Sequence, residues 1–246
     1  MLEQIEIAAD IIKNSRYCTA FTGAGISVES GIPPFRGENG IWNRYDPRIL
    51  ELRYFSNYPE ESWRVIKEIF YDYFGRAAPN RAHRLLAEME EAGMLESIIT
   101  QNIDNLHHEA GSREVIEFHG NSRELLCTEC GRILPAEESL LKILPPRCRC
   151  GALLKPNFVF FGETIPTNAL SRSEEESEKS DCMLLIGTTG EVYPAAFLPR
   201  QASMKGASII EINPSPSLYT SEITDVFIRS TAVEAAEALG KIFFST

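Results

Sequence analysis

A Rossmann-like α/β fold with a smaller second lobe is the architecture that this sequence predicts, on three observations. Short apolar runs alternate with helical patterns over most of the chain, which is typical of a parallel sheet. Several of these runs end in glycine-rich or polar turns, and such turns meet at one edge of an open α/β sheet. Two segments interrupt the alternation, an aromatic-rich one at 41–79 and a cysteine-rich one at 127–150. We expect these two to form the smaller lobe.

Length and charge narrow the class of protein. The 246 residues suffice for one large domain or two small ones. The net charge of −11 argues against a direct nucleic-acid partner and weakly favours basic partners. No apolar run approaches the roughly 20 residues of a membrane span, and the N-terminus lacks a signal-like apolar core. We therefore expect a cytoplasmic protein that does not act at a membrane.

The first strand leads into a glycine-rich turn. An amphipathic helix over 2–14 should come first, with one apolar side formed by Leu2, Ile5, Ala8, Ala9 and Ile12. A buried strand at 17–21 then runs into Gly23, Ala24 and Gly25, the kind of turn that holds phosphates. The third glycine of a dinucleotide fingerprint is replaced by Val28, so the turn indicates a nucleotide more than a dehydrogenase. An ordinary structural turn is the alternative.

A stiff segment at 31–37 follows. Pro33 and Pro34 fix the backbone and would deliver Phe35 and Arg36 close to the glycine turn. Phe35 could cover a ribose and Arg36 could meet a phosphate. The alternative is a buried phenylalanine and a solvated arginine.

The aromatic segment at 41–79 reads as a helical insertion and lid, whose aromatic side chains belong to a core. Asn80 is placed to cap a further helix that stops at Gly93. His83, in the first turn of that helix, is expected to be packed or hydrogen-bonded.

Polar residues follow two of the predicted strands. The strand at 97–100 ends in Gln101, Asn102, Ile103 and Asp104, which could contact amides and ribose hydroxyls. The strand at 115–118 ends in His119, which is placed like a general base. His107 and His108 are adjacent on a predicted helix, so they do not share a face, and we expect both to be structural.

Four of the six cysteines predict a metal site. Cys127 and Cys130 form one pair, and 17 residues later Cys148 and Cys150 form another. Four thiolates leave no open position for a substrate water, so the site should hold one structural zinc ion. Cys18 and Cys182 lie within apolar runs, where we expect plain core residues.

The remaining segments continue the α/β pattern. A short hydrophobic strand with a turn is expected at 157–163, and a solvated helix face at 173–181. Buried strands at 182–186, 207–212 and 225–228 precede a closing helix. The first of these strands ends in a small-residue turn, 187–190, suited to phosphate or ribose.

Taken together, the motifs resemble those of the sirtuins, the NAD-dependent protein-lysine deacylases, in their bacterial or archaeal form. The matching stretches occur in sirtuin order: GAGIS (23–27), GIPPFRG (31–37), PNRAH (79–83), TQNIDNLH (100–107), HG (119–120), the cysteine pairs, FGE (161–163), VYPAA (192–196) and INP (212–214). Two departures stand out, because Pro34 replaces the Asp or Thr of many relatives and the turn at 187–191 reads GTTGE.

The resemblance implies a set of site residues. His119 would be the general base, with Asn102 also in the catalytic centre. The residues implied around NAD⁺ are Gly23, Ala24, Gly25, Val28, Phe35, Arg36, Gln101, Asn102, Ile103, Asp104, His119, Gly187, Thr188, Thr189, Asn213, Pro214 and Ala232. Those implied around the acyl-lysine peptide, bound as an added strand, are Val159, Phe160, Phe161, Gly162, Glu163, Glu191, Val192 and Tyr193.

The resemblance also implies lobes and an acyl preference. The large lobe would comprise 1–35, 80–122 and 156–246, and the small lobe 36–79 and 123–155. Relatives that prefer succinyl-lysine carry Tyr-x-x-Arg before the Pro-Asn pair. Here Lys67 and Phe70 fall at those positions, although Tyr73 and Arg76 share the spacing, so we expect a neutral acyl group. The alternatives are a mono-ADP-ribosyltransferase and a non-enzymatic NAD-sensing or ADP-ribose-sensing module; a dehydrogenase fits less well.

Overall fold

The computed structural model describes residues 2–35, 40–73 and 77–244, and its main element is a six-stranded parallel sheet. The strand order is β3-β2-β1-β7-β8-β9. The strands are β1 (Cys18–Thr22), β2 (Ser97–Thr100), β3 (Val115–Glu117), β7 (Cys182–Ile186), β8 (Ser208–Asn213) and β9 (Val226–Arg229). All six predicted strands of this sheet are confirmed to within one or two residues. The chain builds outward from β1 in one direction and from β7 in the other, so ligands are expected at the β1/β7 boundary.

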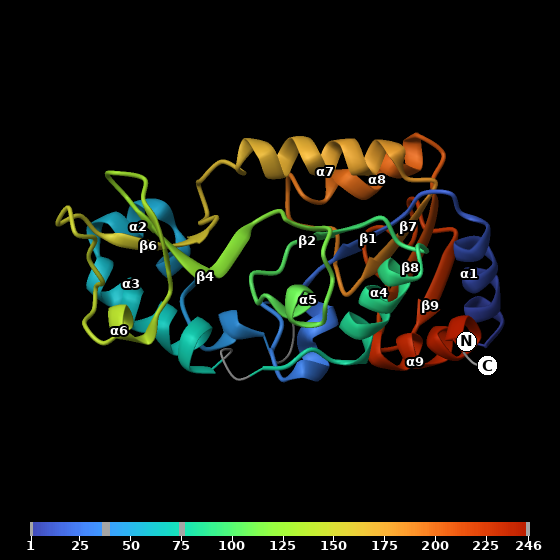
Figure 1. The fold of residues 1–246 in the computed structure, drawn as a ribbon, viewed down its shortest axis with the longest axis horizontal. Coiled ribbons are helices and arrows are strands. Elements are labelled where there is room, and N and C mark those ends of the chain that lie inside the picture. The colour runs from blue at the N-terminus through green and yellow to red at the C-terminus, as the bar shows by residue number, and fades with distance from the viewer. Residues whose placement is uncertain (1, 36–39, 74–76, 245–246) are drawn as a thin grey trace.

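Helices cover both faces of the sheet (Figure 1). One face carries α1 (Leu2–Asn14), α4 (Arg81–Glu91) and α9 (Ala232–Phe244), and the other carries α7 (Thr167–Lys179) and α8 (Phe197–Met204). Successive strand residues enter opposite cores, as Ile98 and Ile99 do, which explains why these strands are apolar throughout. The prediction for α1 is confirmed except at Leu2, which is 72% exposed at the first helical position.

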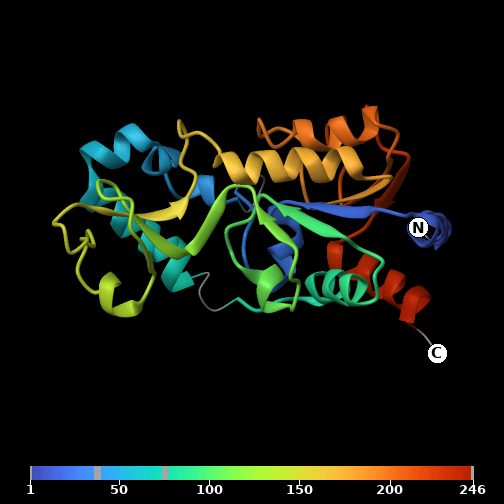
Figure 2. The same cartoon turned by 45° about the horizontal axis from the view of Figure 1, so that its top comes forward.

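The small lobe lies at the end of the molecule away from both termini (Figure 2). Its three-stranded antiparallel sheet has the order β5-β4-β6, formed by β4 (Gly120–Cys127), β5 (Ile133–Pro135) and β6 (Leu154–Phe158), and α6 (Glu138–Leu141) lies beside it. The helical insertion supplies η2 (Ile41–Asn43), η3 (Pro47–Leu50), α2 (Leu52–Asn57), α3 (Pro59–Ile66) and the π-helical η4 (Lys67–Tyr73). The lobe boundaries inferred from sequence stay a prediction.

The prediction of one further strand is only partly correct. The strand expected at 157–163 begins earlier, and β6 ends at Phe158. Beyond it the chain makes only a single bridge, between Phe161 and Glu51, and turns at Gly162 with a φ of 89°. The apolar pattern of 158–161 reflects packing in the small-lobe core rather than a continuous ladder.

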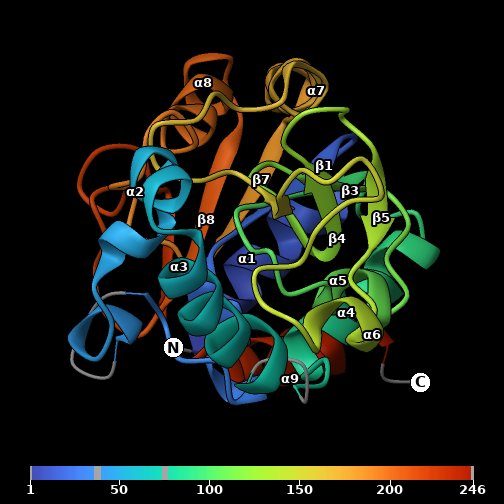
Figure 3. The ribbon, with the colours of Figure 1, turned by 90° about the vertical axis from the view of Figure 1, so that its left-hand side faces the viewer.

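The helical insertion and the antiparallel sheet lie side by side in the small lobe (Figure 3). Aromatic residues of the insertion connect the two parts. Trp63 is fully buried, and its indole N–H donates a 2.8 Å hydrogen bond to the Leu154 carbonyl of β6. Phe55 packs edge-on against Phe160, with ring centroids 5.2 Å apart. Cys127 and Cys148 belong to the same buried cluster as these aromatic residues, so the aromatic and cysteine-rich segments share one core. Among the described residues, no helix combines the length and apolarity needed to cross a bilayer.

Candidate active site

Two glycine turns meet backbone to backbone at the β1/β7 boundary. Gly25 N–H donates a 2.9 Å hydrogen bond to the Gly187 carbonyl. A Cβ on Gly25 would come 2.5 Å from Gly187 Cα, and one on Gly23 would come 2.7 Å from Gly187 O. A side chain at either glycine would push the two turns apart, so their close approach requires glycine at both positions. The N–H of Ala24, by contrast, donates to no described backbone group and stays available at this edge of the sheet.

The end of β2 is bonded directly to the first glycine turn. The side-chain amide of Asn102 donates to Gly23 O at 3.1 Å and to Ser27 Oγ at 3.2 Å. Ser27 lies in η1 (Ala24–Ser30), the 3₁₀ helix after the turn, and its hydroxyl donates to Asp104 Oδ2 at 2.6 Å. Because both Asn102 amide contacts use the nitrogen, its oxygen faces the other way.

Asp104 is a buried carboxylate at this edge. Burial raises its pKa, while hydrogen bonds from Ser27 and from the Leu106 N–H act in the opposite direction. Gln101, three positions earlier, donates from Nε2 to Thr188 Oγ1 at 3.0 Å. The predicted polar turns after β2 and β7 are thus brought together as expected.

His119 is oriented by a backbone carbonyl. Its Nδ1 lies 3.1 Å from Gln101 O, and because a carbonyl can only accept, Nδ1 carries the proton. The lone pair is therefore on Nε2. Burial lowers the pKa of His119, so the neutral imidazole is favoured. This is the protonation state that a general base needs.

The other two buried histidines make hydrogen bonds within the fold, and their purely structural role stays a prediction. His83 completes a capping box with Asn80 at the start of α4, and burial lowers its pKa to about 4. Its Nε2 lies 3.4 Å from Ser27 Oγ, so it also supports the glycine turn from behind. His107 Nε2 contacts the Thr22 hydroxyl at 2.9 Å, and burial lowers the pKa of His107 as well.

Asn213 and Thr188, which the resemblance implies beside the cosubstrate, are in contact with each other. The amide of Asn213 donates to Thr188 O at 2.9 Å, which joins the ends of β8 and β7. On η1, Glu29 accepts from Thr231 Oγ1 at 3.1 Å and from Val233 N–H at 2.9 Å. The first turn of α9, with Ala232, therefore lies against the helix that follows the glycine turn.

More backbone groups of the segment 159–163 are hydrogen-bonded within the protein than we expected for a segment that pairs with a peptide. Val159 N–H donates to His119 O at 2.8 Å, which fixes this segment beside the histidine. Phe161 gives both its N–H and its C=O to the chain at 50–52. Both backbone groups of Phe160 are paired with Glu163. The Phe160 N–H donates to the Glu163 carboxylate at 2.7 Å, and the Phe160 carbonyl accepts from the Glu163 N–H. Among the described residues of this segment, Gly162 keeps both backbone groups unpaired.

Phe35 faces the small-lobe aromatic residues. Its ring lies 5.4 Å from that of Trp42 and 6.4 Å from that of Phe70, and Trp42 in turn lies 6.5 Å from Phe161. Ile103 packs on the same cluster from the β2 side. Arg36, the expected phosphate contact, lies outside the described residues.

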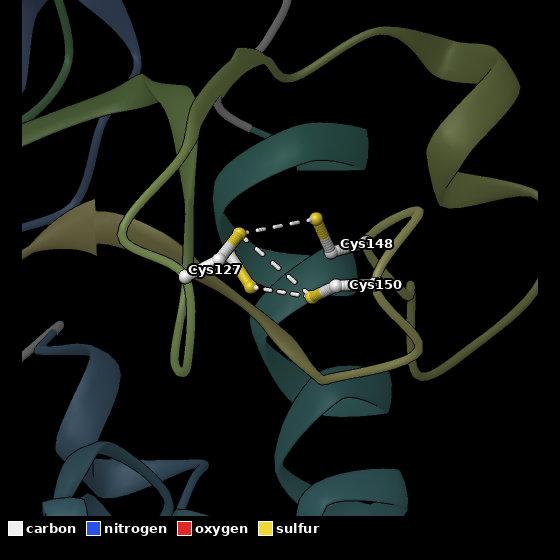
Figure 4. A group of neighbouring side chains, drawn as sticks. Cys127, Cys148 and Cys150 are labelled. Carbon is white, nitrogen blue, oxygen red and sulfur yellow. Dashed lines mark hydrogen bonds between the residues drawn. The ribbon is translucent and has the colours of Figure 1, made fainter.

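The four predicted cysteines converge. Their Sγ atoms all lie within 4.8 Å of one another, with separations of 3.5 Å for Cys127–Cys150 and 3.8 Å for Cys130–Cys148. The labelled side chains point their sulfur atoms toward a common centre (Figure 4). Tetrahedral zinc with Zn–S bonds of about 2.3 Å needs sulfur separations of about 3.8 Å, so the set fits one zinc ion.

Some site residues were missed by the sequence argument. Ser27, Glu211 and Lys155 were not singled out, although all three are buried polar groups bonded to predicted site segments. Ser27 stands inside the GAGIS stretch, which could have indicated it. Glu211 stands two positions before Asn213, the spacing that puts two strand residues on one face.

The fold and the site define a nucleotide-binding α/β protein with a zinc-binding lobe, and comparison with known proteins gives the family. The Sir2 family model matches residues 23–194. An NAD-dependent protein deacylase of Aeropyrum pernix is 45% identical over 98% of this chain and 98% of its own. NAD-dependent protein deacylase 1 of Archaeoglobus fulgidus is 44% identical over 93% of both. The chain belongs to the Sir2 family.

Solved structures agree. A Sir2 protein described with a deacetylated p53 peptide and 3′-O-acetyl ADP-ribose superposes with a TM-score of 0.92 at 37% identity, covering 97% of this chain and 98% of that one. A Sir2 homologue in complex with ADP-ribose superposes with a TM-score of 0.91 at 41% identity, covering 96% of each chain. The predicted family and fold are thereby confirmed.

Proposed function

We propose that this protein is an NAD-dependent protein-lysine deacylase. It consumes NAD⁺ and one water molecule, transfers the acyl group of an acyl-lysine to the ADP-ribose part of NAD⁺, and releases nicotinamide, O-acyl-ADP-ribose and free lysine. The observation that carries the proposal is His119, a neutral histidine whose Nε2 is left to accept a proton beside the turn formed by Gln101, Asn102 and Asp104. Family membership supports the same conclusion.

The residues of the glycine turns and of the β2 end hold the cosubstrate. Gly23 and Gly25 allow close backbone approach, and the free Ala24 N–H suits a phosphate oxygen. Asn102 presents its amide oxygen, fixed by two bonds through its nitrogen. Asp104 accepts from an amide or a hydroxyl. One backbone donor, two side-chain acceptors and a turn without side chains at its glycines are together suited to a dinucleotide.

His119 acts on a ribose hydroxyl. The acyl oxygen would replace nicotinamide on the ribose carbon of NAD⁺. His119 Nε2 would then take the proton of a neighbouring ribose hydroxyl, whose oxygen attacks the acyl carbon. The aromatic residues around Phe35 and Phe161 keep bulk water from the reacting sugar. The zinc ion has no chemical step, because four cysteines complete its coordination.

The acyl-lysine peptide lies as an added strand between 160–163 and 191–193. Gly162 supplies the backbone N–H and C=O on one side, since the backbone groups of Phe160 and Phe161 are already paired. Tyr193, 65% exposed, lies on the other side. Backbone pairing of this kind makes the site tolerant of peptide sequence while the acyl-lysine side chain is selected.

Incubation of the protein with NAD⁺ and an acetylated peptide tests the proposal, with peptide and nucleotide products measured by mass spectrometry. Free lysine peptide and nicotinamide in equal amounts, with O-acetyl-ADP-ribose, are expected. ADP-ribosylated protein without deacetylated peptide would indicate a mono-ADP-ribosyltransferase instead. NAD⁺ binding without turnover would indicate a sensing module. A His119→Ala variant serves as the catalytic control.

A further inference from the structure

Glu211 is a buried acidic side chain that the proposed reaction does not use. It lies on β8, is 0% exposed, and forms no ion pair with any described lysine or arginine. Instead it accepts three hydrogen bonds. Oε1 accepts from Asn213 Nδ2 at 3.0 Å, and Oε2 accepts from the hydroxyls of Thr220 at 2.7 Å and Thr224 at 2.8 Å. The cost of burying such a group is met only when its oxygens are bonded in this way.

The contact with Asn213 determines which way that amide faces. Both residues stand on one face of β8, because they are two positions apart on a strand. The Asn213 nitrogen donates to Glu211 Oε1 and also to Thr188 O at 2.9 Å. A flipped amide would set its oxygen against two acceptors and lose both bonds. The oxygen Oδ1 is therefore turned away from them, and it accepts from no described residue.

We propose that Glu211 is a positioning residue for the nucleotide: it fixes Asn213 with its amide oxygen toward the adenosine ribose, so that the site accepts a hydroxyl and rejects a phosphate there. This inference rests on the proposed function and on the family resemblance, which implies that Asn213 contacts the adenosine half of NAD⁺. A ribose hydroxyl donates to an amide oxygen. A 2′-phosphate offers oxygen acceptors that would face another acceptor.

Calorimetric binding of ADP-ribose and of 2′-phospho-ADP-ribose tests the inference without turnover. Wild-type protein is expected to bind ADP-ribose more tightly. Glu211→Gln can offer an amide N–H to Asn213, so it removes one of the two acceptors that oppose the flipped orientation and leaves the Thr188 carbonyl as the other. We expect this variant to reduce the affinity ratio of the two ligands about 5-fold, the effect of weakening one charge-assisted hydrogen bond. The KM for NAD⁺ should rise while kcat at saturation stays near that of wild type.

Thr224→Val is the matched control. It removes one bond to Glu211 Oε2 and leaves the Oε1 contact with Asn213 in place. It should lower the unfolding temperature as Glu211→Gln does, with the affinity ratio unchanged. Equal changes of the ratio in both variants would mean a merely structural role for Glu211 and would overturn the inference.

A measurement on the wild-type protein covers the case in which Glu211→Gln does not fold. Both Asn213 side-chain amide protons are bonded, so in ¹⁵N-labelled protein without nucleotide they should exchange slowly with solvent. Fast exchange of either proton would contradict the fixed orientation. Wild-type protein that binds no ADP-ribose would overturn the proposed function and this inference together, whereas an unchanged ratio in Glu211→Gln overturns this inference alone.

Discussion

Ser27 donates a 2.6 Å hydrogen bond to Asp104 across 77 positions of the chain. The bond joins the 3₁₀ helix after the glycine turn to the polar end of β2. It also offsets the burial that raises the pKa of Asp104. The same hydroxyl accepts from Asn102, so one small side chain organises two residues proposed to contact the cosubstrate.

Ser27→Ala should therefore weaken nucleotide binding. Loss of the hydroxyl leaves Asp104 and the Asn102 amide each one partner short. We expect the Kd for ADP-ribose to rise about 10-fold, as for a buried polar group deprived of its partner. Ser30→Ala, on the same 3₁₀ helix, removes only an acceptor for Asn80 and should bind ADP-ribose as wild type does. Similar losses in both variants would contradict a specific role for Ser27.

Substitution of His119 should abolish turnover and leave the fold intact. His119→Ala removes the proposed general base, which is expected to lower kcat/KM by about 10²- to 10⁴-fold. The circular dichroism spectrum should be unchanged. His108→Ala is the control, because His108 lies on α5 (Leu106–Glu109) and contacts Glu117 instead of the site. Activity of His119→Ala within a few-fold of wild type would refute the assignment.

The pH dependence of activity should show the lowered pKa of His119. Burial favours the neutral imidazole, and the neutral form is the one that accepts a proton. The acid limb of the kcat/KM profile should then fall below pH 6.5, the ordinary value for histidine. A limb at or above that value would show that a different group limits the reaction.

His83 makes stability depend on pH in the same range. Its pKa falls from 6.5 to about 4 on burial, so the unfolded chain binds the proton first. Its contribution is present in full above pH 6.5 and is lost as the pH falls toward 4. Linkage predicts a loss of about 2 kcal/mol of unfolding free energy between about pH 7 and pH 5. Urea unfolding of His83→Asn should show a pH dependence smaller by this amount; an unchanged dependence would contradict the prediction.

Zinc should be bound at one ion per chain and should stabilise the small lobe. Cys127→Ser removes one of the four converging thiols and is expected to reduce bound zinc from about one to near zero and lower the unfolding temperature. Cys182→Ala, in the sheet core, should keep its zinc. Elemental analysis of the zinc content of both variants tests this prediction. Full activity in wild-type protein free of zinc would exclude a structural metal.

The acyl group removed should be neutral. Phe70 packs against Phe158 at 5.2 Å, and Lys67 is held by Asp72 at 2.6 Å, so neither offers a cation to a buried carboxylate. The side chain of Tyr73, and Arg76 as a whole, lie outside the described residues. We expect kcat/KM for an acetyl-lysine peptide to exceed that for the succinyl peptide by at least about 10-fold. A higher succinyl value, lost in Arg76→Met, would reverse the conclusion.

The local features of this protein follow from short stretches of its sequence. The strand before Gly23, the cap at Asn80 and the strand at 97–100 are determined by apolar runs, turn glycines and a capping side chain, all of which act over a few residues. The cysteine pairs are equally local, because the spacing within each pair suits one metal. The irregular course after Phe158 was not predicted, since an apolar run alone does not distinguish a ladder from a packed loop.

The tertiary structure alone decided which distant residues meet. β1 lies between β2 and β7, so Cys18 faces Cys182 and the glycine of one turn touches the glycine of another. The bonds from Ser27 to Asp104 and from Asn213 to Thr188 depend on that strand order. A buried hydroxyl or carboxyl group needs a hydrogen-bond partner, and the spacing of residues in the sequence does not specify which residue that partner is. The packing of the sheet specifies the partner, because it determines which backbone and side-chain groups lie within hydrogen-bonding distance of each other.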